Sequence, residues 1–307
     1  MSGSVTITEV GPRDGLQNER SALGTEAKVA FVHDLVDAGV RHVEVTSFVH
    51  PGRVPAMADA EDVFRAVNRR EGVRYIALTP NRRGWDRARS VGCDAVAVLT
   101  AASEGFTGAN LGMSIPDTLA RIKEVTDLAR GEGVWVRGYV STIFACPYNG
   151  PVDPEVVADL TEQILDLGCD EVSLGDTIGV GTPSDVRRLL DVMAKRVPME
   201  ALALHCHDTW GMAAVNVMAA LEYGMRIFDG SAGGLGGCPF APGATGNAAT
   251  EDLGVLLHGL GYDTGLDLGA VAAAAARIGE GLDHPLTGRA HNALLSRAKS
   301  TNEGDTC

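Results

Sequence analysis

The sequence predicts an α/β protein with a (β/α)8 barrel of the TIM type, followed by a short C-terminal helical appendage. Eight short apolar or β-branched stretches alternate with amphipathic stretches of helical length along the 307 residues. This alternation is typical of parallel βα units, which form either an open doubly wound sheet or a closed barrel. The count of eight, the chain length and the lack of a GxGxxG loop or a P-loop favour the closed barrel.

The expected strands are short and rich in apolar or β-branched residues. They are Val5–Val10, His42–Phe48, Tyr75–Pro80, Ala95–Ala101, Trp135–Ser141, Glu171–Asp176, Leu202–Asp208 and Ile227–Ser231. The expected helices between them share an amphipathic pattern. They include Thr25–Ala38, Ala56–Arg69, Ile115–Arg130, Pro154–Leu167, Pro183–Arg196 and Met212–Tyr223. We expect residues 1–265 to form the barrel and residues 266–307 a helical extension and tail of the same domain.

Several expected helices have recognisable ends. Thr25 can cap the first helix and Gly39 can end it. Pro154 and Pro183 stand where a first helical turn tolerates a missing N–H group. Four similar stretches, "DAGVRHVEV", "SVGCDAVAV", "DLGCDEVSL" and "EYGMRIFDG", place a glycine between a helix and the next strand, as a repeated βα unit requires.

Composition excludes some partners and suggests a compartment. The formal charge of −14 and the isoelectric point near 5.0 argue against nucleic acid or an anionic membrane surface as a partner. We find no long apolar run of membrane-spanning length, and the first residues do not resemble a signal peptide. The six cysteines show no tight spacing, so we expect free thiols and a cytoplasmic location.

A strand that ends in two histidines is the most informative motif. In "LALHCHDTWG" the side chains of His205 and His207 point to the same face, because successive residues of a strand alternate faces. Two imidazoles on one face either satisfy a polar core by hydrogen bonding or hold a metal ion. The motif alone leaves both interpretations open, so further ligands must come from the other strand ends.

Two charged residues follow the first strand, at the end of the barrel where chemistry gathers, and a third lies within the second strand. Asp14, in "EVGPRDGLQNE", is either a turn residue or the carboxylate that a divalent site requires. Arg13 is either a surface charge or a group that holds an anionic oxygen beside the cation. Glu44, inside "HVEVTSF", is costly to bury alone. Arg13 is its expected partner.

Four more polar groups fall after strands. Ser47 ends the second strand, and Asp176 in "SLGDTIG" either caps a turn or positions a substrate group. Asn247 either caps the next helix or completes a metal shell. Cys238 lies in the glycine-rich stretch "GSAGGLGGCPFAPGATGN", whose eighteen residues without clear secondary structure are typical of a lid or binding loop. Its thiol is either an inert small group or one made acidic by a cation and an arginine.

Six stretches together resemble the 3-hydroxy-3-methylglutaryl-CoA lyases, a family of metal-dependent TIM-barrel enzymes. They are "EVGPRDGLQNE", "TSFVHP", "RGYVS", "SLGDTIGVGTP", "HCHDTWG" and "GLGGCPFAPGATGNAATEDL". The likeness runs in register from about Val5 to Gly265. Isopropylmalate and homocitrate synthases, of the wider group, share the Arg-Asp, Glu and His-x-His positions but not the cysteine-containing stretch.

The resemblance implies four metal ligands, namely Asp14, His205, His207 and Asn247. It also implies that Arg13 contacts the substrate, backed by Glu44, and that Cys238 is a catalytic thiol. Mixed nitrogen and oxygen ligands suit Mg²⁺ or Mn²⁺, although two histidines and one carboxylate also fit Fe(II). The metal identity therefore stays open between these ions, with Mg²⁺ or Mn²⁺ preferred.

The reaction implied is cleavage of 3-hydroxy-3-methylglutaryl-CoA to acetyl-CoA and acetoacetate, the chemistry of leucine degradation and ketone-body formation. Asp14 or His205 takes the hydroxyl proton, Arg13 stabilises the charge growing on the thioester oxygen, and Cys238 protonates the enolate carbon. Asp176 and Ser47 are expected substrate contacts.

Three further functions remain compatible with the sequence alone. They are a lyase for another 3-hydroxy-3-alkylglutaryl-CoA, a Claisen-type synthase, and a non-catalytic barrel that binds acyl-CoA. The expected partner is a small acyl-CoA substrate, with neither nucleic acid nor membrane, and a homodimer is left open.

Overall fold

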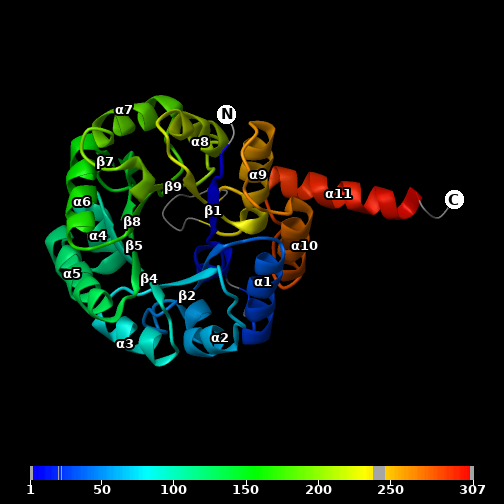
Figure 1. Ribbon diagram of the computed structural model, residues 1–307, viewed down its shortest axis with the longest axis horizontal. Coiled ribbons are helices and arrows are strands. Elements are labelled where there is room, and N and C mark those ends of the chain that lie inside the picture. The colour runs from blue at the N-terminus through cyan, green and yellow to red at the C-terminus, as the bar shows by residue number, and fades with distance from the viewer. Residues whose placement is uncertain (1–2, 20, 22, 238–245, 305–307) are drawn as a thin grey trace.

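Eight parallel strands close into a barrel in the computed structural model, which describes residues 3–19, 21, 23–237 and 246–304 (Figure 1). The barrel strands are β1 (Thr6–Glu9), β2 (His42–Ser47), β3 (Arg74–Leu78), β4 (Ala95–Ala101), β5 (Trp135–Ser141), β8 (Glu171–Asp176), β9 (Leu202–Cys206) and β10 (Ile227–Gly230). Neighbours around the barrel follow chain order, and β1 closes the ring against β10, with Thr6 opposite Ile227. The predicted (β/α)8 barrel is confirmed.

Helices surround the strands. They are α1 (Thr25–Asp37), α2 (Ala60–Ala66), α3 (Arg82–Ser90), α4 (Glu104–Leu111), α5 (Ile115–Glu132), α6 (Pro154–Asp166), α7 (Pro183–Met193), α8 (Ala213–Glu222), α9 (Thr250–Gly259), α10 (Leu268–Gly279) and α11 (Arg289–Gly304). A small antiparallel pair, β6 (Ala145–Cys146) with β7 (Gly150–Pro151), lies outside the barrel sheet. No helix among the described residues has the length and apolar character needed to cross a membrane.

Most predicted ends agree with the structure. Pro154 and Pro183 each follow a residue whose side chain caps the helix, Asp153 and Thr182 respectively. The four expected glycine joints all adopt positive φ, at Gly39 (102°), Gly92 (73°), Gly168 (105°) and Gly224 (88°). A side chain at Gly39 would also meet the carbonyl oxygen of Gly265 at 2.1 Å. These joints therefore need the conformational range of glycine.

Two local predictions were wrong. Thr25 does not cap α1, because Gly24 occupies the N-cap position and the Thr25 hydroxyl donates instead to Oδ2 of Asp59 at 2.7 Å. Helix α2 is shorter than the predicted Ala56–Arg69, because Pro55–Met57 forms a separate 3₁₀ turn before it. The sequence pattern did not separate that turn from the helix.

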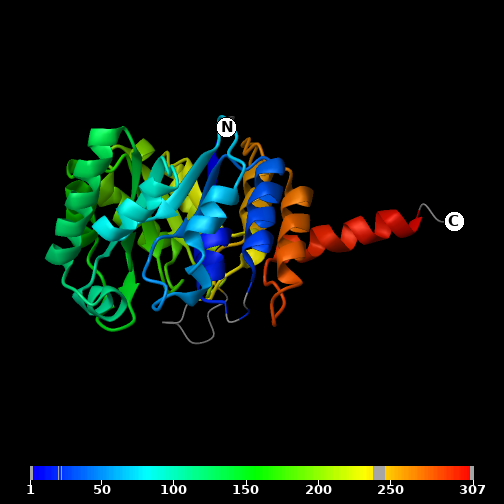
Figure 2. The same cartoon turned by 90° about the horizontal axis from the view of Figure 1, so that it is seen from below.

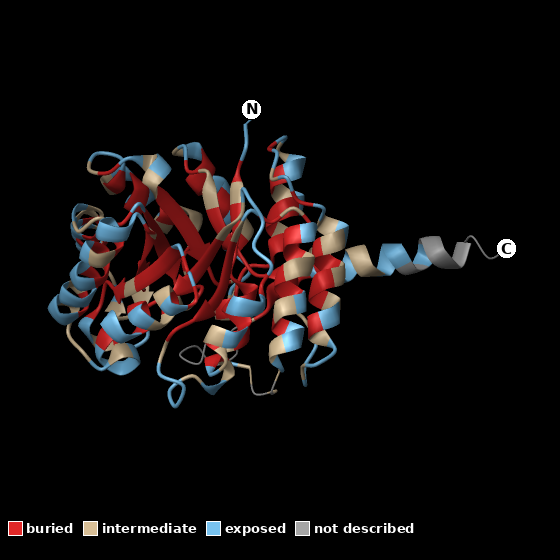
Figure 3. Cartoon of the chain, turned by 60° about the horizontal axis from the view of Figure 1, so that its bottom comes forward, coloured by how far each residue is buried: buried red, intermediate tan, exposed pale blue. Residues whose placement is uncertain are grey.

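The main apolar core lies between the strands and the surrounding helices, where the strands are buried along their length (Figure 3). Val136 and Val140 of β5, for example, face this layer together with Ile164 of α6. A second, smaller cluster inside the barrel holds Ile76 and Tyr139. The barrel interior also contains charged groups, and these connect the core to the site described below.

The C-terminal part packs on one side of the barrel. Helix α10 lies against α1 and α9, and α11 begins against α9 and then projects away from the barrel (Figures 1 and 2). The domain boundary expected at residue 265 stays a prediction. The buried side chains of Val271, Ala274 and Ile278 show how α10 covers the apolar surface beside α1.

Candidate active site

A tight turn places Arg13 and Asp14 at the carboxyl end of β1. The backbone N–H groups of Arg13, Asp14 and Gly15 all donate to the Val10 carbonyl, at 3.2, 2.7 and 3.1 Å, within a π-helical turn at Gly11–Gly15. Such turns are rare and occur often at functional sites. This geometry directs both side chains toward the barrel axis rather than into solvent.

Arg13 and Glu44 form the ion pair that the sequence predicts. Nε of Arg13 donates to Oε2 of Glu44 at 2.8 Å and Nη2 lies 2.6 Å from the same oxygen, and both side chains are buried. Nη1 of Arg13 also donates to Oδ1 of Asp14 at 2.5 Å. The Tyr139 hydroxyl adds a hydrogen bond to Glu44 at 3.1 Å. The guanidinium is therefore fixed in position and stays positively charged.

Asp14, His205 and His207 form a cluster that can hold a metal ion. Each offers one ligand atom, and these atoms lie within 4.8 Å of one another. The centroids of the two imidazole rings are 5.3 Å apart, and Nε2 of His207 lies 4.0 Å from Oδ2 of Asp14. Strand alternation accounts for the shared face of the two histidines, and the neighbouring positions of β1 and β10 in the ring, with β9 next, bring Asp14 close to them.

Asn247, the last residue of the glycine-rich stretch, contacts the same cluster. Its Nδ2 donates to Oδ2 of Asp14 at 3.0 Å and to the carbonyl of Leu235 at 3.1 Å. Its Oδ1 is buried and has no hydrogen-bond partner. The interpretation of Asn247 as the cap of the following helix was wrong, because Ala249 occupies the N-cap position of α9.

Burial and neighbouring charges shift the pKa values of Asp14 and His207 toward the protonation states that bind a cation. Burial alone would raise the pKa of Asp14, but the charge of Arg13 and those of the two histidines lower it to about 2. Burial and then the charge of His205 lower the pKa of His207 to about 4. Near neutral pH the carboxylate is therefore ionised and the His207 ring is neutral, and both forms carry lone pairs for a metal.

The imidazole of His205 is hydrogen-bonded to the carboxylate of Asp229, a residue that the sequence analysis did not identify. Nδ1 of His205 lies 3.1 Å from Oδ2 of Asp229, a buried residue of β10. Burial would lower the pKa of His205, but this hydrogen bond and the charges of Asp229 and Asp14 raise it. Because Nδ1 faces Asp229, the other ring nitrogen, Nε2, is left to face the cluster.

Asp229 belongs to a charged network inside the barrel. The fully buried Arg137 lies 2.6 Å from Oδ1 of Asp229 through Nη2 and 2.7 Å from Glu171 through Nε. Ser173 donates to Oδ2 of Asp229 at 2.9 Å. The signal that could have found Asp229 and Arg137 is the one that identified Glu44, namely a charged residue within an apolar strand.

A cleft of about 930 Å³ opens over the cluster, and Arg13, Asp14, His205 and His207 lie on its wall. Its two carboxylates, on Asp14 and Glu61, are each paired with an arginine. Three further arginines, Arg53, Arg83 and Arg121, also line the cleft. The cleft is therefore basic although the chain is strongly acidic, which favours an anionic substrate.

Asp176 and Ser47 are both buried at the carboxyl ends of their strands. Both carboxylate oxygens of Asp176 accept backbone N–H groups, from Val180 at 3.2 Å and Gly181 at 2.8 Å, so this residue shapes the turn after β8. Burial raises the pKa of Asp176 to about 6. Ser47 is fully buried and its Oγ has no hydrogen-bond partner. Their expected contacts with substrate stay predictions.

Cys238 lies outside the described residues, so the structure does not place its thiol. The described residues on either side, Gly237 and Gly246, are both close to the cluster. Gly237 lines the cleft, and the carbonyl of Gly246 accepts the N–H of Asp208 at 2.8 Å. The expected role of Cys238 stays a prediction.

The chain is a (β/α)8-barrel protein with a candidate metal centre. Its imidazole–carboxylate cluster lies at the carboxyl ends of the barrel strands, where such barrels carry their sites. Within that class, the chain belongs to the HMGL-like family, whose family model matches residues 4–278.

Relatives in this family are similar over nearly the whole chain. The chain is 49% identical over 295 residues to the hydroxymethylglutaryl-CoA lyase of Pseudomonas mevalonii, covering 96% of this chain and 98% of that protein. It is 48% identical over 294 residues to the 3-hydroxy-3-isohexenylglutaryl-CoA/hydroxy-methylglutaryl-CoA lyase of Pseudomonas aeruginosa, again covering 96% and 98%. The crystal structure of hydroxymethylglutaryl-CoA lyase from Pseudomonas aeruginosa superposes with a TM-score of 0.93 at 48% identity, with 96% of this chain and 98% of that chain covered.

Proposed function

We propose that the chain is a divalent-metal-dependent lyase that cleaves 3-hydroxy-3-methylglutaryl-CoA into acetyl-CoA and acetoacetate. The observation that carries this proposal is the placement of Arg13 beside the Asp14–His205–His207 cluster on one cleft wall, in a chain of this family. The identities to the two Pseudomonas lyases support this cleavage over a synthase reaction or a non-catalytic binding role. The basic cleft suits a substrate that carries a free carboxylate and the phosphates of CoA.

The donor set fits a divalent cation. Asp14 and the two histidines supply one carboxylate and two imidazoles, and the unpartnered Oδ1 of Asn247 supplies an amide oxygen. Oxygen-rich mixed shells with room for water suit Mg²⁺ or Mn²⁺, which we prefer to Fe(II). A cation held there would act as a Lewis acid toward the hydroxyl and carboxylate oxygens of the substrate.

Side chains of the site can carry out the remaining steps of the reaction. The C3 hydroxyl loses its proton to Asp14 or His205, the C2–C3 bond breaks, and its electron pair moves into the enolate of acetyl-CoA while C3 becomes the ketone carbon of acetoacetate. Arg13, fixed by Glu44, is oriented to stabilise the enolate oxygen. We assign the protonation of C2 to Cys238, because a thiol near a cation and an arginine is a suitable acid at neutral pH.

A coupled assay tests the function directly. Purified protein supplied with 3-hydroxy-3-methylglutaryl-CoA and Mg²⁺ should release acetyl-CoA and acetoacetate in equal amounts. The isohexenyl analogue belongs in the same assay, because one relative is named for both substrates. Absence of acetyl-CoA release from every 3-hydroxy-3-alkylglutaryl thioester would refute the lyase and favour a non-catalytic barrel.

The oligomeric state and location stay predictions of the same proposal. A homodimer can be checked by size-exclusion chromatography with light scattering. A cytoplasmic location is supported by the four described cysteines, Cys93, Cys146, Cys169 and Cys206, which are free thiols. Fractionation of the source cells would test it.

A further inference from the structure

The segment that joins α10 to α11 packs against the start of the glycine-rich stretch. The N–H of Gly288 donates to the carbonyl of Gly233 at 2.9 Å. Gly233 has a φ of 69°, and a Cβ there would lie 2.5 Å from Cδ1 of Leu286. Because Gly233 comes shortly after β10, the C-terminal segment supports the point where the chain leaves the barrel.

A buried carboxylate connects this point to α11. Oε2 and Oε1 of Glu251 accept the N–H of Gly233 at 2.8 and 3.1 Å, and Oε1 lies 3.1 Å from Nδ1 of His291. Glu251 is fully buried and His291 is 3% exposed. A carboxylate only accepts hydrogen bonds, so His291 acts as the donor through Nδ1.

The same backbone segment orients Asn247. The carbonyl of Leu235, two residues after Gly233, accepts Nδ2 of Asn247 at 3.1 Å. Ser231 N–H also donates to the carbonyl of Ala248 at 2.9 Å, which ties the two ends of the glycine-rich stretch together. A shift of the backbone at Gly233 would therefore turn the Asn247 amide and move its unpartnered Oδ1.

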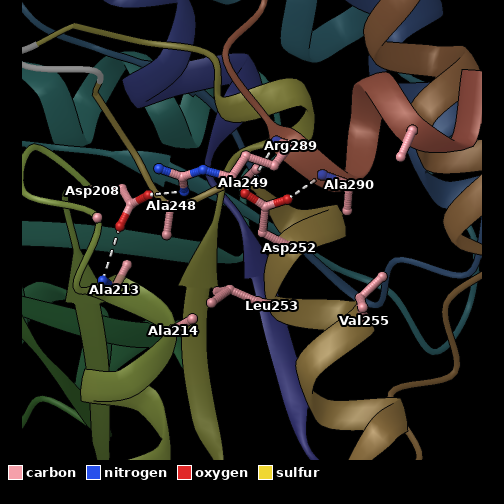
Figure 4. A pocket seen from close by; sticks show the side chains of 12 residues that line it. Asp208, Ala213, Ala214, Ala248, Ala249, Asp252, Leu253, Val255, Arg289 and Ala290 are labelled. Carbon is pink, nitrogen blue, oxygen red and sulfur yellow. Dashed lines mark hydrogen bonds and ion pairs between the residues drawn. The ribbon is translucent and has the colours of Figure 1, made fainter.

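A second contact fixes the first turn of α11 at the same place (Figure 4). Asp252, next to Glu251, accepts the N–H groups of Arg289 at 3.3 Å and Ala290 at 2.5 Å. The side chain of Arg289 donates to Asp208 at 3.0 Å, one residue after His207. His291 is thus held on a helix end that is anchored to both α9 and the segment after β9.

We propose that His291 is a positioning residue for the metal centre, acting through Glu251 and the Gly233–Leu235 backbone on Asn247. The proposal rests on the function proposed above. His291 itself is not placed on the cleft, so its effect is to fix the direction of the amide oxygen. Partners that orient ligands from outside the coordination shell commonly change metal affinity about 10–100-fold when removed.

Three variants test this. His291→Leu keeps the volume but removes the donor, whereas His291→Asn places an amide N–H near the position of Nδ1. His258→Ala is the matched control, because His258 is an exposed histidine on α9 that bonds Thr264 rather than the buried network. Mn²⁺ binding is measured directly by electron paramagnetic resonance, kcat and KM are measured at saturating Mn²⁺, and folding is checked by circular dichroism.

We expect His291→Leu to weaken Mn²⁺ binding about tenfold, with kcat reduced more than KM changes, while His291→Asn and His258→Ala bind Mn²⁺ like the parent. Equal Mn²⁺ affinity in His291→Leu and the parent would overturn the proposal. So would equal weakening in His291→Leu and His291→Asn, because restoring an N–H donor near the position of Nδ1 would then make no difference to Mn²⁺ binding. If His291→Leu does not fold, His291→Ala takes its place in the same comparison. Failure of the parent itself to bind Mn²⁺ would instead refute the proposed metal centre.

Discussion

Nδ2 of Asn247 donates to Oδ2 of Asp14 over 3.0 Å, across a separation of 233 positions in the chain. The amide group also donates to Leu235, so both contacts hold its nitrogen side. The oxygen Oδ1 is therefore turned away from these acceptors and is left buried without a partner. A buried polar atom without a partner is costly, and a ligand that binds it removes this cost.

Removal of divalent cations should abolish activity. The reason is that Asp14, His205 and His207 each offer a ligand atom within 4.8 Å of the others, and the buried Oδ1 of Asn247 has no hydrogen-bond partner. Activity should return with Mg²⁺ or Mn²⁺ and should survive treatment with a chelator already saturated with Mg²⁺. Full turnover by protein shown to be metal-free by elemental analysis would contradict the proposed centre.

Substitution of Arg13 by Gln should lower kcat by roughly 10²–10³ with a smaller change in KM, because the charge it stabilises develops only during bond cleavage. Arg13→Lys is the control for charge without the two-pronged contact to Glu44, and it should retain part of the activity. Steady-state kinetics with 3-hydroxy-3-methylglutaryl-CoA give both constants. An unchanged kcat with a raised KM would mean that Arg13 only anchors substrate.

Asp229→Asn should weaken metal binding about 10–100-fold, because the His205 ring loses the carboxylate that orients it. The variant also leaves Arg137 with one buried carboxylate fewer, so a lower melting temperature is expected. Ser173→Ala is the matched control, since Ser173 donates a single hydrogen bond to the same carboxylate. Mn²⁺ titration separates the two effects, and equal affinities in Asp229→Asn and Ser173→Ala would argue against a specific role for the charge.

Cys238→Ala should lose roughly 10²–10⁴ in turnover while keeping metal affinity, because it removes a proton donor and no ligand. Alkylation should inactivate the parent, and substrate should protect it. Burial raises the pKa of Cys93 and of Cys169 to about 12, so these thiols should react slowly. Cys307→Ala is the control for the terminal thiol, and peptide mass mapping identifies the modified position. Normal turnover by Cys238→Ala would remove the thiol from the mechanism.

Stability should depend on pH through Glu9, whose pKa burial raises from 4.5 to about 7. Between these values the folded protein retains a proton that the unfolded chain releases, so the free energy of unfolding falls as pH rises through this range. The full effect is about 3 kcal/mol. Glu9→Gln should flatten this dependence, whereas the exposed control Glu71→Gln should not. Urea unfolding at pH 5 and pH 8 measures it, and parallel pH profiles for Glu9→Gln and the parent would show that Glu9 does not titrate there.

Sequence reasoning predicted that certain residues at the strand ends come together, and the structure places them in one cluster. His205 and Asp14 were predictable because parallel strands in a barrel bring their carboxyl ends to one side. The pairing of Arg13 with Glu44 followed from the cost of burying a lone carboxylate. Both inferences needed only strand boundaries, and the structure places those within one or two residues of the predicted ones.

Other features depend on three-dimensional contacts that no local pattern encodes. The π-helical turn that aims Arg13 requires three N–H groups to share one carbonyl. The role of Asp229 depends on which strand closes the ring beside β9. The contact of His291 with Glu251 joins α11 to α9. The alanine-rich sequence of α10, which lies between them in the chain, does not specify how these two helices pack.

Closure of the barrel through β1 and β10 governs when the protein can fold during synthesis. Thr6 pairs with Ile227, so β1 has no partner on that side until nearly three-quarters of the chain has been made. Until then the edge of β1 can pair with other chains, and such edges promote aggregation. A fragment that ends before Ile227 should therefore aggregate in a translation extract more than the full chain does, and a chaperone that shields the nascent strand should suppress the difference.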